Sequence, residues 1–126
     1  MKNLLIVFTG GGTGSIVRYL LGKWVTNLSG SGGFPYGTFV VNIVACLMLG
    51  IVMAMADEKN ILSPTVRLLL AVGFCGGFST FSTFSAESLM LFQKGESITA
   101  VAYIFASVLV CLSSTLAGMW AVRQFV

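Results

Sequence analysis

Long apolar segments alternate with short polar ones along the whole chain. Apolar residues dominate from about 4 to 21, 38 to 56, 65 to 92 and 98 to 122. Most of these segments are close to the ~20 residues that a helix needs to cross a bilayer. A chain in hydrocarbon must satisfy its own backbone hydrogen bonds, which favours helices. The pattern therefore predicts an all-α integral membrane protein, with four transmembrane helices in a single domain over residues 1–126.

The third apolar segment contains an interruption. Residues 73–85 read GFCGGFSTFSTFS, in which three glycines and five hydroxyl side chains stand among four phenylalanines. Each glycine lowers helix propensity by about 1 kcal/mol relative to alanine, so we expect the third helix to break near Gly73–Thr80. A helix broken at membrane depth exposes backbone groups to protein or water and is a candidate ion site. Close helix packing through the glycines is the alternative, and the glycines alone do not decide between the two.

Composition excludes several classes of function. Hydrophobic residues make up 56% of the chain and charged residues 9%, with a mean hydropathy of +0.96. There is no histidine, and the three cysteines have neither metal-ligand spacing nor the even number of a disulfide framework. We interpret them as small buried hydrophobic residues. Four spans leave no room for a soluble catalytic domain, and the net charge of +3 is thinly spread. We therefore expect neither an enzyme nor a nucleic-acid-binding protein.

The first span carries a stripe of small residues. Gly10, Gly14, Arg18 and Gly22 recur every four residues and share one helix face. Small residues on such a face allow another backbone to approach closely. Two interpretations of Arg18 are open: its side chain snorkels to the interface, or it projects into a polar vestibule where its charge attracts anions. The glycine, serine and proline content of residues 23–37 predicts a loop after this span.

Few polar side chains interrupt the other spans. Asn42 either hydrogen-bonds to another helix or presents its NH2 group to a dehydrated anion. We expect Glu87, toward the end of the third span, to reach the interface or to pair with a cation. In the fourth span, side chains at intervals of four form a narrow stripe that serves either packing or function. This stripe consists of Tyr103, Ser107, Cys111 and Thr115.

The loop charges give only a weak orientation signal. In a four-span protein the two termini and the second loop share one side of the membrane. That side carries Lys2, Lys59, Arg67 and Arg123, and the other carries Lys23, Lys94 and, near its edge, Arg18. So small a bias does not fix one orientation by the positive-inside rule, and such a chain could insert both ways. Four short helices also enclose little space, which favours a dimer.

Three motifs together resemble one family. They are the GFCGGFSTFSTFS run, the GTFVVN segment that ends at Asn42, and the GGxGSxxR pattern of residues 11–18. These motifs closely resemble the small bacterial fluoride channels of the Fluc (CrcB-type) family, over the whole chain. The resemblance implies a multi-pass protein of the bacterial inner membrane that exports fluoride passively and so relieves fluoride toxicity. It also implies a dual-topology homodimer of two antiparallel subunits with two pores.

The resemblance also implies roles for individual positions. Phe81 and Phe84 match the pore phenylalanines, and Asn42 matches the pore asparagine. Gly76 and Ser79 match positions whose backbone carbonyls hold a structural Na+ at the centre of the dimer. The remaining matches are a vestibule arginine and a polar track, at Arg18, Tyr103, Ser107 and Thr115.

The chemistry of these residues suits fluoride, which is small and strongly hydrated. The edge of a phenyl ring carries partial positive charge and attracts an anion without the full charge that would trap it. The Asn42 NH2 group and the hydroxyls of Ser82, Thr83 and Ser85 could add donors. Cys111 departs from the polar track, because a thiol is a weaker donor than a hydroxyl.

Two other functions are open at this point. A proton-coupled efflux transporter of the small multidrug type also has four spans and often dual topology. It needs a carboxylate deep in its first helix, and the first span here has none. A non-transporting assembly subunit accounts for the glycine stripes but not for the run of phenylalanines and hydroxyls. Ion flux through the purified protein in liposomes separates the three.

Overall fold

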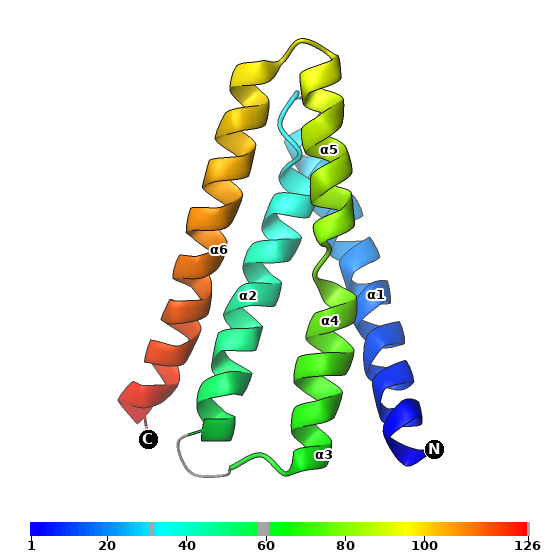
Figure 1. Ribbon diagram of the computed structural model, residues 1–126, viewed down its shortest axis with the longest axis vertical. Coiled ribbons are helices and arrows are strands. Elements are labelled where there is room, and N and C mark those ends of the chain that lie inside the picture. The colour runs from blue at the N-terminus through cyan, green and yellow to red at the C-terminus, as the bar shows by residue number, and fades with distance from the viewer. Residues whose placement is uncertain (31, 58–60, 126) are drawn as a thin grey trace.

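The computed structural model describes residues 1–30, 32–57 and 61–125 as a bundle of four long helical segments (Figure 1). Three of the segments are continuous helices: α1 (Lys2–Ser29), α2 (Tyr36–Asp57) and α6 (Ser97–Phe125). Within the described residues, all four segments are long and apolar enough to cross a membrane. The predicted all-helical, four-span architecture is confirmed.

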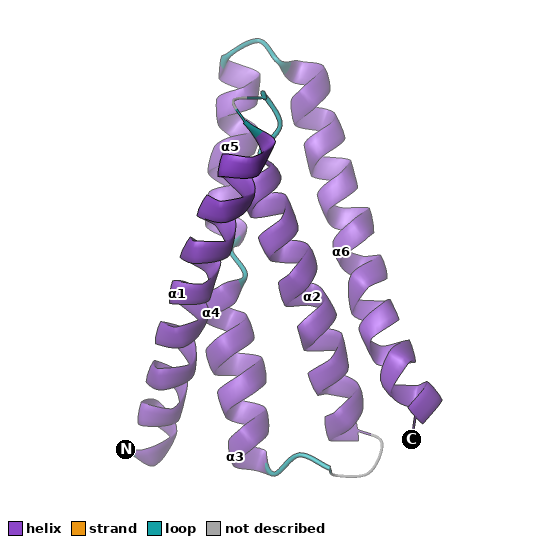
Figure 2. Ribbon diagram, turned by 180° about the vertical axis from the view of Figure 1, so that it is seen from behind, coloured by secondary structure: helices purple, strands orange, loops and turns teal. Residues whose placement is uncertain are grey.

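The third span, Pro64–Gln93, is divided into several helical pieces. They are α3 (Pro64–Arg67), the π-helical η1 (Leu68–Cys75), α4 (Gly76–Phe78) and α5 (Phe81–Gln93). Between α4 and α5 the chain is extended at Ser79 (φ −77°, ψ 154°) and Thr80 (φ −148°, ψ 109°). Figure 2 shows this short non-helical connection at mid-height in the bundle. The predicted interruption of the third helix is present, at the end of the expected range.

The first helix is longer than the sequence pattern predicts. The expected loop over residues 23–37 is wrong for residues 23–29, which continue α1 as far as Ser29, and for residues 36–37, which already belong to α2. Residues 23–28 (KWVTNL) contain no glycine or proline, so nothing in them breaks a helix. The helix ends at Gly30, whose positive φ of 69° suits glycine.

Helices that are not adjacent in sequence make the most extensive contacts in the bundle. α1 lies mainly against η1 and α4 of the third span, and α2 lies mainly against α6. A Cβ atom on Gly14 would collide with the carbonyl oxygen of Phe74, and one on Gly77 with that of Gly11. The glycine stripe of α1 therefore packs closely against the third span. Gly76 is different, since a Cβ there would meet nothing within 4 Å.

The two chain termini lie at the same end of the bundle as α3 (Figure 1). This end carries Lys2, Arg67 and Arg123, while Lys59 lies outside the described residues. Two clusters of buried side chains fill the interior. One joins α5 to α6 around Phe84 and Tyr103, and the other joins α2 to α4 around Val41 and Phe78. The second cluster adjoins the broken part of the third span, because Phe78 directly precedes Ser79.

Candidate functional site

The extended connection in the third span is held by the side chain of Asn42 on α2. The Thr80 backbone N–H donates to Asn42 Oδ1 at 3.0 Å, and Asn42 Nδ2 donates to the Thr80 carbonyl at 3.4 Å. In a continuous helix, the Thr80 N–H would instead donate to the carbonyl of Gly76, four residues earlier. The interhelical hydrogen bond considered for Asn42 is therefore present, and its partner is the backbone of the break.

A cavity of about 240 Å³ opens beside this connection. We call it the phenylalanine cavity. The wall of the cavity is formed by α2, the third span and α6. Its lining includes the predicted residues Asn42, Phe81, Phe84 and Ser107, together with Thr80 and Cys111. The structure thus brings together residues from three spans that the sequence analysis had identified separately.

The two phenylalanines of the cavity lie in different environments. Their ring centroids are 5.4 Å apart and the ring planes are inclined at 46°. Phe84 is 9% exposed and lies against Tyr103, with centroids 5.2 Å apart, whereas Phe81 is 77% exposed on the single subunit. Phe84 is fixed by its neighbours, and Phe81 leaves most of its surface available to a further contact.

Ser107 provides a free donor in the cavity wall. This residue of α6 is buried, and its Oγ has no hydrogen-bond partner within the part of the chain that the structure describes. An unpaired buried hydroxyl costs free energy, so such groups normally have a partner. A hydroxyl that is buried, unpaired and beside an open cavity is well placed to bind a ligand.

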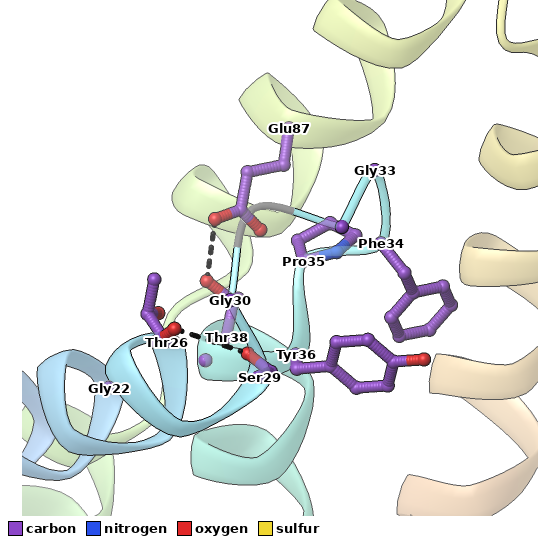
Figure 3. Close-up of a pocket in the computed structure, with 12 residues that line it drawn as sticks. Gly22, Thr26, Ser29, Gly30, Gly33, Phe34, Pro35, Tyr36, Thr38 and Glu87 are labelled. Atoms are coloured by element: carbon purple, nitrogen blue, oxygen red, sulfur yellow. Dashed lines mark hydrogen bonds between the residues drawn. The ribbon is translucent and has the colours of Figure 1, made fainter.

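Glu87 joins two hydroxyl groups at one end of the bundle. Thr38 Oγ1 donates to Glu87 Oε1 at 2.7 Å, and Tyr103 Oη donates to Glu87 Oε2 at 2.8 Å. Figure 3 shows the first of these bonds at the edge of a cavity of about 360 Å³. In the described residues Glu87 forms these hydroxyl contacts and no ion pair, so the expected cation partner is not found. Sequence reasoning missed Thr38, because no local pattern links it to a carboxylate on another span.

Arg18 lies at a further cavity, of about 250 Å³. Thr38, Thr80 and Thr83 also line this cavity, so the guanidinium group belongs to a region rich in hydroxyls. Of the two interpretations of Arg18, this position favours the vestibule. Thr80 lines the phenylalanine cavity as well, and the break in the helix therefore borders both spaces.

The other predicted hydroxyls are mostly bonded within their own helices. Thr80 Oγ1 accepts from the Thr83 N–H at 3.3 Å and forms the N-cap of α5. It also shares hydrogen bonds with the hydroxyls of Thr83 (3.0 Å) and Ser82 (3.3 Å). Thr115 donates to the carbonyl of Cys111 at 3.2 Å and does not line the phenylalanine cavity. Ser85 is exposed and also lies outside that cavity.

Of the two residues whose carbonyls are predicted to bind Na+, Gly76 begins α4 just before the break, and Ser79 lies within the break and lines the phenylalanine cavity. Gly76 is exposed. Its carbonyl does not accept the helical hydrogen bond from the Thr80 N–H, because that N–H donates to Asn42 Oδ1 instead. Ser79 is partly exposed and its own hydroxyl donates to the Cys75 carbonyl at 3.0 Å. Carbonyl oxygens with free lone pairs are ligands suited to hard cations. Both residues are therefore chemically able to contribute to a cation site.

Comparison with known proteins identifies the family. A family model described as "CrcB-like protein, Camphor Resistance (CrcB)" matches residues 5–119. The chain belongs to the CrcB family. This membership confirms the family that the motifs resembled, and with it a multi-pass membrane protein.

Curated relatives of this CrcB-family chain share the name "Fluoride-specific ion channel FluC". The relative from Phocaeicola vulgatus is 43% identical over 120 residues, which are 95% of this chain and 98% of the relative. The relative from Rhizobium etli is 40% identical over 126 residues, all of both chains. Because these CrcB-family relatives are named as channels, the prediction that the chain is not an enzyme is also confirmed.

Proposed function

We propose that this CrcB-family protein is a channel that conducts fluoride passively through the phenylalanine cavity. The curated relatives, which match nearly the full chain, are named as fluoride-specific channels. The observation that carries the proposal is the buried, unpaired Ser107 hydroxyl beside Phe81 and Phe84. A hydroxyl donor and the positive edges of two rings are neutral groups that attract an anion.

Neutral donors explain how the ion both enters and leaves. A conducting site must bind the ion strongly enough to replace its hydration water but weakly enough to release it. A buried arginine would hold fluoride too tightly, because the full charge acts at short range in a medium of low dielectric constant. Ring edges and hydroxyls avoid this, and two phenylalanines and three hydroxyl-bearing residues are among the residues that line the cavity.

The cavities define the order of groups along the proposed pathway. The positive charge of Arg18 attracts fluoride into the hydroxyl-lined vestibule. Thr80 borders both the vestibule and the phenylalanine cavity, which makes it the point of passage between them. The phenylalanine cavity then offers the Ser107 hydroxyl, and Tyr103, one helical turn along α6, donates its own hydroxyl to Glu87. Asn42 contributes mainly by holding the break open, with its second amide hydrogen available as a donor.

The proposal includes an antiparallel homodimer with a structural Na+. Phe81, at 77% exposed, presents an aromatic surface of a kind that subunit interfaces commonly cover. A two-fold axis near the break would bring together Gly76 and Ser79 carbonyls from both subunits. Unwound backbone carbonyls of this kind coordinate Na+ in other membrane proteins. The sodium ion would then stabilise the interface without being transported.

Fluoride efflux from liposomes tests the proposal. Wild-type protein should release fluoride far faster than chloride and without accompanying proton movement, whereas a proton-coupled transporter must move protons with its substrate. Phe81→Ile and Phe84→Ile keep apolar volume and remove the ring, so each should lose most of the fluoride flux. Phe105→Ile, at an exposed position on α6, is the matched control and should conduct normally. Normal flux in both cavity variants would show that the rings only pack.

A further inference from the structure

The three cysteines come from different spans, and Cys46 borders one cavity with Cys111 and another with Cys75. Cys46 on α2 and Cys111 on α6 both line the phenylalanine cavity. The two cysteines thus come from different spans and border the same space. Cys75 of η1 is buried and lines a separate cavity of about 130 Å³, which Cys46 also borders. The interpretation of all three as packing residues therefore does not describe Cys46 and Cys111, which face an open space together.

A pair of facing thiols selects a particular class of ligand. Thiolates are soft ligands and prefer soft d10 cations such as Hg²⁺, Ag⁺ and Cu⁺ over hard cations. Structural zinc needs four ligands. The described residues contain no cluster of three or more histidine, cysteine, aspartate or glutamate side chains. Two thiolates alone complete the linear coordination that Hg²⁺ and Ag⁺ favour.

We propose that Cys46 and Cys111 form a two-thiolate site for a soft d10 cation in the wall of the phenylalanine cavity, and that occupancy of this site blocks ion conduction. The cavity measures about 240 Å³, and Asn42, Phe81, Phe84 and Ser107 share it. A bound metal ion therefore lies among the groups assigned to fluoride. The blocking part of the proposal rests on the proposed function, and the binding part does not.

The binding step is a ligand exchange without any change of oxidation state. With HgCl2, each cysteine sulfur forms one bond to mercury and each S–H bond is lost. Two chloride ions leave the metal, and two protons pass to the solvent. HgCl2 is uncharged and crosses lipid, so it reaches a cavity at membrane depth. Each bound Hg²⁺ consequently consumes two thiols of the same subunit.

The test measures fluoride efflux from liposomes with and without HgCl2, in a buffer containing a small monothiol. The monothiol removes mercury that a single cysteine holds, whereas the chelated pair retains it. Wild-type efflux should fall to near the protein-free background and should return when excess dithiol is added. Cys46→Ser and Cys111→Ser should each keep their own metal-free flux under the same conditions. Cys75→Ser is the matched control and should be blocked like wild type.

A thiol count provides a second readout that does not depend on transport. After mercury treatment and unfolding, wild-type protein should have lost two of its three titratable thiols per subunit. Block that persists in Cys111→Ser but disappears in Cys75→Ser would overturn the assignment, by making Cys46 and Cys75 the pair. Block that persists in both Cys46→Ser and Cys111→Ser would place the site elsewhere. If metal-free protein conducts no fluoride, the proposed function fails, while the thiol count still decides whether the site exists.

Discussion

The side-chain amide of Asn42 forms two hydrogen bonds with the backbone of Thr80: it accepts from the N–H and donates to the carbonyl. It thereby replaces the carbonyl that the Thr80 N–H would bond in a continuous helix. The amide of one span thereby bonds the N–H of the peptide group before Thr80 and the carbonyl of the peptide group after it. In hydrocarbon, where water is scarce, the N–H would otherwise be unpaired at a high cost. The break in the third span is thus a property of two spans together.

Replacing Asn42 by alanine should destabilise the protein. The change leaves the Thr80 N–H without its partner, and a buried unsatisfied group costs about 1–3 kcal/mol. We expect a lower midpoint of thermal unfolding in detergent, together with loss of fluoride flux. Ser113→Ala is a suitable control, because the exposed Ser113 hydroxyl bonds only to the Leu109 carbonyl of its own helix. A stability equal to wild type would show that the amide does not hold the break.

Ser107→Ala should separate conduction from packing. The Ser107 hydroxyl has no partner within the described residues, so its removal should leave the unfolding midpoint unchanged or slightly higher. Fluoride flux should fall nevertheless, because the cavity loses a donor. Ser88→Ala is the matched comparison: its buried hydroxyl donates to the Phe84 carbonyl at 2.8 Å, and its loss should cost about 1 kcal/mol of stability. Undiminished flux in Ser107→Ala would remove this residue from the pathway.

Two neighbouring glycines of α1 should respond in opposite directions to alanine. A Cβ on Gly14 would collide with the Phe74 carbonyl, so Gly14→Ala should lower the free energy of unfolding by about 1–3 kcal/mol. A Cβ on Gly12 meets nothing within 4 Å. Gly12→Ala should therefore raise stability by up to about 1 kcal/mol through helix propensity. Thermal unfolding of both variants checks the prediction, and equal effects would contradict it.

Single cysteines at the two ends of the bundle should reveal dual topology. Residue 60, in the second loop, lies outside the described residues, so we choose the exposed positions Gln93 and Gln124 instead. Gln93 lies at the end of the third span and Gln124 near the end of the fourth, so the two lie at opposite ends of the bundle. A maleimide that cannot cross lipid should label each variant partly from outside the cell and completely only after permeabilisation. Complete labelling of one position from outside, with none of the other, would establish a single orientation.

Replacement of sodium by a large organic cation should weaken the dimer. The exposed Gly76 and Ser79 carbonyls would repel one another across a two-fold axis without a cation between them. We expect both fluoride flux and the dimer fraction in detergent to fall and to recover when sodium is restored. Potassium at the same ionic strength controls for screening. If neither quantity changes without sodium, these carbonyls do not bind a structural ion.

Much of the fold follows from the sequence because hydropathy in a membrane is a strong constraint. The four spans, the side shared by the termini and the interrupted third span were all predictable on that basis. The end of α1 was not, because the polar residues 23–29 were grouped with the glycine-rich loop that follows them. Polarity alone does not end a helix, and here the end coincides with the positive φ of Gly30.

The candidate site was predictable residue by residue but not as an arrangement. Phe81, Phe84 and Ser107 were identified from their chemistry, and the structure places them on one cavity. The partners of Asn42 and Glu87 could not be predicted, because each lies on another span and the sequence contains no local signal for the pairing. Thr115 shares the four-residue spacing, and its hydroxyl donates to the Cys111 carbonyl of its own helix. Its place in the pathway stays a prediction.

The pairing of spans has a consequence for biosynthesis. The main partner of α1 is the third span, and the main partner of α2 is α6, so neighbours in sequence are not the principal neighbours in space. When the spans are inserted in order, α1 enters the lipid before the third span does. Until the third span follows, the small residues of α1 that pack against it face acyl chains. The final helix α6 then completes the second pair, with α2. The main contacts of the bundle therefore form only after the third and fourth spans have been inserted, and not between successive helices as each hairpin is made.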